Sequence, residues 1–170
     1  EDRIFKVPFG VNIASVQNTF NRNKDICFYP AQFWPHKNHL NLLLAFKLIR
    51  GNFDRDLKLV LPGGDKGNLD RVRAAIRELK LEDCVVTPGY IDEAEIAELY
   101  KTCAFMIYPS LFGPDNIPPL EALAAGCPVL VADQPGAREQ FGDLVEYFDA
   151  LNHEDIAKSM TRGFKTQLSC

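Results

Sequence analysis

The strongest constraint on the fold of this chain is a regular alternation between two kinds of apolar pattern. Short apolar runs typical of buried strands occur at residues 26–29, 57–61, 84–87, 104–108, 128–132 and 144–148. Between them, apolar residues recur every three or four positions, which predicts helices over 39–50, 69–79, around 96–100, over 119–125 and from 153 towards 163. Strands and helices alternating in this way predict an α/β fold, a Rossmann-like parallel sheet with helices on both faces.

Right-handed crossovers between parallel strands bring all strand-to-helix loops to one edge of the sheet. Four loops rich in Gly, Pro, Asn and Asp are expected at that edge, at residues 30–38, 62–68, 88–92 and 109–118. Residues 1–25 are polar and weakly periodic, so we interpret them as a linker entering a domain that spans 26–170. Asn68 and Asn152 are the expected N-caps of the helices that follow them.

The loop 109–118 leads into an apolar helix through Pro118 and Pro119, with Glu121 in the first turn. Loops of this kind bind phosphates and sugars in open α/β sheets. The two prolines have no N–H, so the amides of residues 116, 117, 120 and 121, with the helix dipole, favour an anion. Glu121 would repel that anion and suits a diol such as the ribose hydroxyls, although a Glu at a helix start is equally well explained by the dipole.

The first loop ends at Lys37, whose ammonium can meet a diphosphate at the same edge; a solvated surface lysine is the simpler alternative. His36 and His39 flank it with no Cys, Asp or Glu nearby to complete a metal site, so we expect surface or capping roles and no metal. Gly63 and Gly64 follow a strand but lack the G-x-G-x-x-G spacing, which disfavours a hydride-transferring dinucleotide enzyme. They allow close approach of a ligand or form a simple turn.

Composition narrows the function classes. The net charge of −4 gives no electrostatic argument for nucleic acid as a partner, and no apolar run approaches the roughly 20 residues of a membrane span. The five cysteines have no metal-ligand spacing, and Cys27 and Cys103 are expected to be buried reduced thiols. Asp133 and Arg138 follow the next strand and either shape the cleft or pair on its rim.

Taken in order, these segments resemble the C-terminal domain of retaining GT-B glycosyltransferases of the large family 4, the glycosyl transferases group 1. The resemblance runs from residue 8 to about 157 and is carried by segments 36–38, 59–64, 85–91, 108–122, 126–129 and 136–143. The segment 112–119 looks most like transferases that build O-antigen and related surface polysaccharides, many of which use mannose or a similar sugar.

The resemblance implies that the chain is one half of a GT-B fold, the half that binds a nucleotide-diphosphate sugar as the donor. It implies a GDP- or UDP-linked donor, no separate cofactor, and a missing N-terminal domain that binds the acceptor. The activity implied is transfer of mannose or a similar hexose to a glycan or lipid-linked acceptor. The location implied is cytoplasmic, with peripheral attachment at the inner face of the membrane through the missing domain.

Carried over residue by residue, the resemblance makes Lys37 and Glu121 the catalytic candidates, holding the diphosphate and the ribose hydroxyls. Gly64 would lie near the phosphates, and the backbone of Tyr90 and Ile91 would meet the base. Donor contacts overall are expected from Gln32, Gly63, Gly64, Tyr90, Ile91, Asp115, Asn116, Ile117, Pro118 and Glu121.

Two positions depart from the family pattern. Gly113 stands where the family often has the first Glu of E-x7-E, and Asp115 is the candidate substitute. Gln32 stands where the family often has an arginine, so diphosphate binding is weaker or is shared with a residue such as Arg138. These departures keep two alternatives open, a non-catalytic nucleotide-sugar-binding subunit and a nucleotide-sugar epimerase on the same fold. We expect the chain alone to bind donor weakly without turnover.

Overall fold

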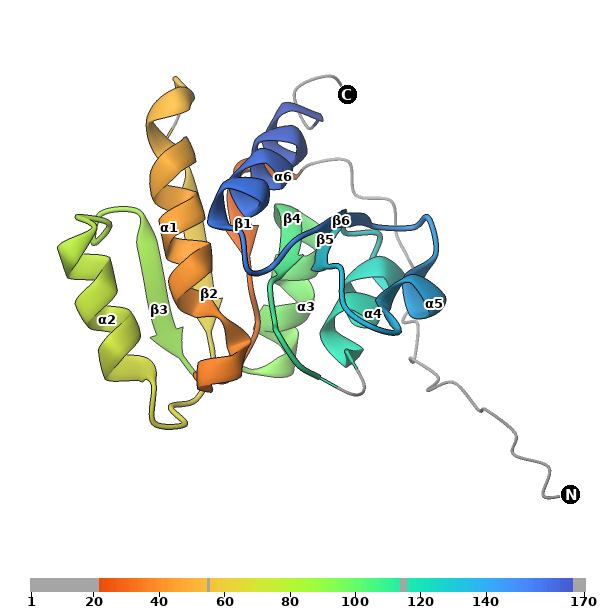
Figure 1. The fold of residues 1–170 in the computed structure, drawn as a ribbon, viewed down its shortest axis with the longest axis horizontal. Helices are drawn as coiled ribbons and strands as arrows, with labels where there is room; N and C mark the ends of the chain where they lie inside the picture. Colours follow the sequence, from red (N-terminus) through yellow and green to blue (C-terminus); the bar gives the residue numbers. More distant parts are fainter. Residues whose placement is uncertain (1–21, 55, 114–115, 167–170) are drawn as a thin grey trace, which may run out of the picture.

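The computed structural model describes residues 22–54, 56–113 and 116–166, which form one parallel sheet flanked by helices (Figure 1). The strands lie in the order β3-β2-β1-β4-β5-β6, and each neighbouring pair is parallel. The predicted Rossmann-like α/β class is therefore confirmed. The strands are β1 (Asn23–Phe28), β2 (Lys58–Pro62), β3 (Val85–Gly89), β4 (Cys103–Tyr108), β5 (Val129–Ala132) and β6 (Glu146–Phe148).

Helices cover both faces of the sheet. α1 packs against α2 and α6 on one face, while α3 and α4 contact the central strands from the other (Figure 1). Every residue of β4 is buried, as expected for a central parallel strand covered on both sides. The helices are α1 (His39–Ile49), α2 (Leu69–Glu78), α3 (Glu93–Thr102), α4 (Ile117–Ala124), α5 (Ala137–Phe141) and α6 (His153–Thr166).

Most predicted elements are confirmed with shifted ends. α4 begins at Ile117, two residues before the predicted start, so both prolines lie in its first turn, where a missing N–H leaves no hydrogen bond unmade. α5 was not predicted, because five residues are too few to show helical spacing. Asn152 caps α6 as predicted, accepting from the amides of Glu154 and Asp155.

The predicted N-cap of α2 is confirmed in its position but not in its capping bond. Asn68 stands at the N-cap position, but its side chain makes no capping bond. The Asp65 carboxylate accepts from the amides of Gly67 and Leu69 instead. An Asx-type bond to the residue two positions on explains why Asp65 holds this turn.

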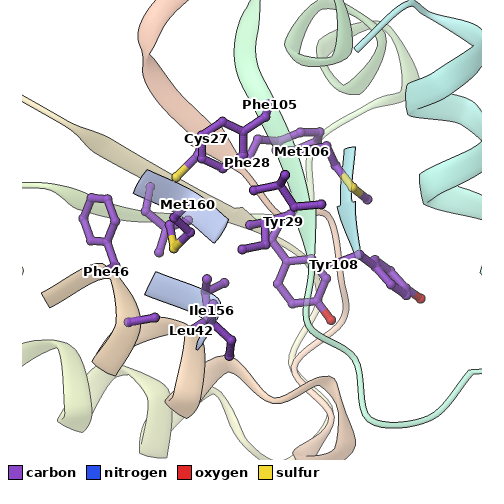
Figure 2. Close-up of a cluster of buried hydrophobic side chains, with 14 of the residues drawn as sticks. Cys27, Phe28, Tyr29, Leu42, Phe46, Phe105, Met106, Tyr108, Ile156 and Met160 are labelled. Carbon is purple, nitrogen blue, oxygen red and sulfur yellow. The ribbon is translucent and has the colours of Figure 1, made fainter. Parts of the chain in front are cut away.

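The core lies between β1 and β4 and the helices α1 and α6. Figure 2 shows Leu42 and Phe46 of α1 with Ile156 and Met160 of α6, packed against strand residues that include Phe105. The predicted burial of Cys27 and Cys103 is confirmed, and both thiols are free, as are those of Cys84 and Cys127. Among the described residues, no helix is both long and apolar enough to cross a membrane.

The expected surface or capping role of His39 is wrong. His39 precedes Leu42 and Leu43 by three and four positions, so it falls on the buried face of α1. It is 1% exposed and its ring stacks on Phe33, with ring centroids 4.6 Å apart. Burial lowers the pKa of His39 to about 3, so the imidazole is neutral. His36, in contrast, is only partly buried beside the exposed Trp34.

Candidate functional site

A cavity of about 360 Å³ opens at the carboxyl edge of the sheet, between the loops that follow β1 and β4. The chain continues from β1 to one side of the sheet and from β4 to the other, so this is the point where the strand order reverses. Open α/β sheets bind ligands at such a point. The cavity is lined by Pro30, Ala31, Gln32, Trp34, Lys37, Tyr108, Gly113, Asn116, Ile117 and Pro118.

Lys37 is the charged group among these lining residues. Its ammonium lies 3.2 Å from the Tyr108 hydroxyl and 3.4 Å from the Ser110 hydroxyl, and 5.4 Å from the centre of the Tyr108 ring. Its carbonyl accepts a 3.0 Å hydrogen bond from Tyr29, whose hydroxyl stays protonated because burial raises its pKa. In the described part of the chain, the Lys37 ammonium forms no ion pair. The site therefore holds a positive charge against neutral oxygens.

Hydrogen bonds to backbone carbonyls hold the loop after β1 against the loop after β4. Asn38 adopts a left-handed conformation (φ 59°), and its side-chain amide donates to the carbonyls of Pro109 (3.0 Å) and Ala150 (2.8 Å). The amide of Leu111 donates to the carbonyl of His36 at 2.8 Å. Lys37 is therefore fixed relative to the loop after β4 before any ligand binds.

The start of α4 forms the opposite side of the cavity. Asn116 precedes the helix in a left-handed conformation, and its side-chain amide donates to Gln140 at 3.3 Å. Gly113 lies between Asn116 and Lys37: a Cβ there would be 3.0 Å from Asn116 Oδ1 and 3.7 Å from Lys37 Nζ. A side chain at Gly113 would therefore crowd Asn116 and the ammonium.

Glu121 lies on α4 and is not among the residues that line the cavity. Its carboxylate accepts a 3.1 Å hydrogen bond from the hydroxyl of Tyr100 on α3. Burial, and then the negative charge of Glu121, raise the pKa of Tyr100, so the phenol stays protonated and donates. One carboxylate oxygen is thereby held in place by the protein.

Gln32 lines the cavity, but its amide oxygen is already used. Gln32 Oε1 accepts from the indole N–H of Trp34 at 3.1 Å, and the Lys66 ammonium lies 6.0 Å from the Trp34 ring centre. Gly63 packs against backbone rather than open space, because a Cβ there would collide with the carbonyl of Ala31. Gly64, in contrast, has open space where its Cβ would stand.

Two of the remaining predicted site residues, Tyr90 and Ile91, lie apart from the cavity lining. Tyr90 is 83% exposed and, with Ile91, follows β3, two strands away from β1. Asp115 lies outside the described residues. Arg138 pairs with Asp133 through 2.6–3.2 Å hydrogen bonds, which confirms the rim pairing given as one of two alternatives.

Sequence reasoning gave no role to Tyr108 and Trp34, two aromatic residues of the cavity. Tyr108 ends the apolar run of β4, and in the sequence it resembles one more core residue. The available signal was its position, because the last residue of a strand at the carboxyl edge faces the loops that bind ligands.

The family comparison covers almost all of the chain. The family model described as "Glycosyl transferases group 1" matches residues 12–167. The chain is 30% identical over 138 residues to the MMP alpha-(1->4)-mannosyltransferase of Mycolicibacterium hassiacum, covering 80% of this chain and 32% of that protein. It is 28% identical over 102 residues to the O-antigen chain mannosyltransferase RfbU of Salmonella typhimurium, covering 60% of this chain and 28% of the relative.

Solved structures agree with the fold. The crystal structure of TarM superposes with a TM-score of 0.81 at 17% identity, covering 93% of this chain and 31% of TarM. The chain thus spans about a third or less of these proteins. Its sheet order, its cavity at the reversal point and the match over residues 12–167 agree with one another, and the chain belongs to the glycosyl transferases group 1 family, with the fold of a GT-B domain.

Proposed function

We propose that this chain is the donor-binding domain of a retaining glycosyltransferase that uses a nucleotide-diphosphate sugar. The single observation that carries the proposal is the Lys37 ammonium, held at a cavity beside the start of α4 and bonded within the described chain only to neutral hydroxyls. A cation without a counter-ion suits a ligand that brings the negative charge.

The diphosphate is the part of the donor that this arrangement fits best. During transfer, the bond between the sugar and the diphosphate breaks and negative charge grows on the leaving phosphate oxygens. Lys37 and the positive end of the α4 dipole stabilise that charge from fixed positions. The cavity lined by Lys37, Gly113 and Asn116 is the proposed place of the phosphate and of the sugar attached to it.

The rest of the donor is assigned by position along the same edge. Glu121 binds the ribose hydroxyls with the carboxylate oxygen that Tyr100 leaves available. Asn116, Ile117 and Pro118 line the donor sugar, and Gly64, with its open Cβ direction, lies near the phosphates. Tyr90 and Ile91 supply backbone contacts to the base. Asp115 is proposed as the sugar contact that replaces the family's glutamate, because Gly113 stands at the position of that glutamate.

The sugar proposed is mannose or a similar hexose, carried on GDP or UDP, because several of the relatives are named mannosyltransferases. The acceptor proposed is a glycan or a lipid-linked glycan, bound by a second, N-terminal domain at the cytoplasmic side of a membrane. The relatives are about three times as long as the stretch that this chain matches, which supports a second domain. We therefore expect the chain alone to bind donor and not to transfer it.

A thermal-shift panel of GDP-, UDP-, ADP- and dTDP-sugars tests the proposal, because a ligand that binds only the folded state raises its melting temperature. One nucleotide series should raise the Tm in a concentration-dependent way, and Lys37→Met should require a much higher ligand concentration for the same shift. Arg138→Met is the matched control and should keep it. No shift with any series at millimolar concentration would contradict donor binding.

A non-catalytic nucleotide-sugar-binding subunit is the second candidate. It is favoured by the absence of any Asp or Glu among the described residues that line the cavity, where Gly113 replaces the family's frequent glutamate. Donor binding with no transfer by a protein that also contains an acceptor-binding domain would favour this candidate. Detection of an epimerised sugar from donor alone would instead favour an epimerase.

A further inference from the structure

The hydrogen bonds around Lys37 leave one donor unused. An ammonium donates and cannot accept, so the oxygens of Tyr108 and Ser110 both accept from Lys37. Each of these hydroxyls still has its own proton to donate. Ser110 donates its proton to the carbonyl of Phe112 at 2.7 Å. Within the described residues, the Tyr108 proton has no such acceptor.

The position of Tyr108 is fixed by packing. Tyr108 is only 6% exposed, and its ring stands edge-on to Tyr29, with centroids 5.5 Å apart and an interplanar angle of 89°. Figure 2 shows Tyr108, the last residue of β4, and Tyr29, which directly follows β1, together in the core cluster. Since the ring cannot rearrange freely, its hydroxyl is a preorganised group rather than an adaptable one.

The hydroxyl of Tyr108 reaches the same space as the ammonium. A Cβ on Gly113 would lie 3.6 Å from Tyr108 Oη and 3.7 Å from Lys37 Nζ. Both residues also line the cavity. Because the hydroxyl and the ammonium are 3.2 Å apart and both residues line the cavity, one ligand oxygen in the cavity can accept from the two together.

We propose that Tyr108 is a ligand-binding residue, whose hydroxyl donates a hydrogen bond to an anionic phosphate oxygen of the diphosphate held by Lys37. This inference rests on the proposed function of the site. The Tyr108 hydroxyl supplies a second donor beside Lys37. In the same cavity, Gln32 carries no charge, and its amide oxygen already accepts from the Trp34 indole. The phenol adds a directed donor without adding charge, so recognition of the negative charge stays with Lys37.

A purely positioning role for Tyr108 is the alternative, since it also accepts from Lys37. A double-mutant cycle separates the two roles. Titration calorimetry of the 170-residue chain with GDP and UDP would compare the unmodified chain, Tyr108→Phe, Lys37→Met and the double variant. Because the phenol bonds the ligand directly, Tyr108→Phe should weaken diphosphate binding roughly 10-fold, and most of that loss should persist in the Lys37→Met background.

Two controls make the result specific. Binding of the corresponding nucleoside, guanosine or uridine, should change by less than about twofold in Tyr108→Phe, because a nucleoside has no phosphate to receive the bond. Ser110→Ala removes an acceptor of Lys37 without removing a free donor and should cost less than Tyr108→Phe. An unchanged Tm would show that Tyr108→Phe keeps the fold.

The outcomes separate this inference from the function it rests on. If the unmodified chain binds neither GDP nor UDP, both proposals fail. If it binds one of them and Tyr108→Phe binds equally well, only the role of Tyr108 fails. If the loss in Tyr108→Phe disappears in the Lys37→Met background, Tyr108 positions Lys37 and does not touch the ligand, which also overturns the inference.

Discussion

Two basic side chains follow strands of the same sheet at the same edge, and their surroundings differ. Lys37, after β1, meets two neutral hydroxyls. Arg138, after β5, binds both carboxylate oxygens of Asp133, which raises the pKa of its guanidinium. The family resemblance implies the diphosphate as the ligand of Lys37, and Arg138 is the residue expected to share it where Gln32 replaces an arginine. The contrast shows that the partner of a cation, rather than its place on the edge, decides whether its charge is available to a ligand.

The environment of Lys37 has a free-energy cost in the protein without ligand. A partly buried cation such as Lys37, which has no counter-ion among the described residues, is less well solvated than a free lysine, and the hydroxyls only partly compensate. Arg138 has no such cost, because its side chain is 66% exposed and paired. An anionic ligand at Lys37 would offset this cost, which is the physical reason to expect a larger effect from Lys37 than from Arg138.

The largest expected effect tests the contrast directly. Lys37→Met should weaken binding of GDP or UDP by roughly 10- to 100-fold, because a hydrogen bond to a charged group contributes about 1.5–3 kcal/mol. Arg138→Met should change it by less than about twofold, since its charge is already neutralised. Titration calorimetry of both variants measures the difference. Equal losses in the two variants would show that the ion pair of Arg138 opens for the ligand.

His39 adds a third basic group near this edge, and its charge is removed by burial rather than by an ion pair. Its pKa is lowered from 6.5 to about 3, first by burial and then by the charge of Lys37. Between these values the unfolded chain binds one more proton than the folded chain, so stability rises with pH. The free energy of unfolding should therefore fall by up to about 1.4 kcal/mol for each pH unit below 6.5.

The measurement is a series of urea denaturation curves at several pH values. In His39→Phe, which keeps an aromatic ring against Phe33, the part of the slope due to His39 should be absent. The same slope in both proteins would mean that His39 is protonated in the folded state or that other groups control the pH dependence. Lys37→Met should move the lower end of this slope to a slightly higher pH, because it removes the smaller cause of the pKa shift.

The fold was predictable from local patterns, because each strand and each long helix carries its own apolar spacing. His39 was predictable too, since it precedes Leu42 and Leu43 by three and four positions and so continues the buried face of α1. α5 was not predictable in the same way, because its five residues show less than two turns of spacing.

The site was predictable only in part. The loops at the carboxyl edge follow from right-handed crossovers, so Lys37 and Asn116 could be assigned to one place. The role of Tyr108 could not be assigned, because it depends on which hydroxyl proton is already used, and that is a property of loops far apart in sequence. Whether Asp133 and Arg138 shape the cleft or pair with each other could likewise not be decided from the sequence, because the answer depends on the distance between their side chains.

Glu121 carries a negative charge, and its replacement is expected to weaken nucleotide binding less than the replacement of Lys37. If it binds the ribose hydroxyls, Glu121→Gln should weaken binding of GDP or UDP about 10-fold, by the loss of a charge-assisted hydrogen bond. The same substitution should have little effect on a 2′,3′-dideoxynucleoside diphosphate, which lacks those hydroxyls. Tyr100→Phe is a useful control, because it frees the carboxylate without removing it. Equal losses for both kinds of nucleotide would remove the ribose from this assignment.

The smallest expected effect on nucleotide binding comes from breaking the ion pair between Arg138 and Asp133. Asp133→Asn keeps the shape of the side chain but removes the negative charge that occupies the guanidinium. Binding of GDP or UDP should strengthen by no more than about threefold, because an exposed charge contributes little in water. The gain should disappear at about 1 M salt, where screening acts over roughly 3 Å, while the contribution of the partly buried Lys37 should persist. Calorimetry at low and high salt measures the gain in Asp133→Asn and the contribution of Lys37. A gain that persists at high salt would show that Arg138 contacts the ligand directly once Asp133 is neutral. In that case the ion pair with Asp133 would be all that prevents Arg138 from acting as Lys37 does.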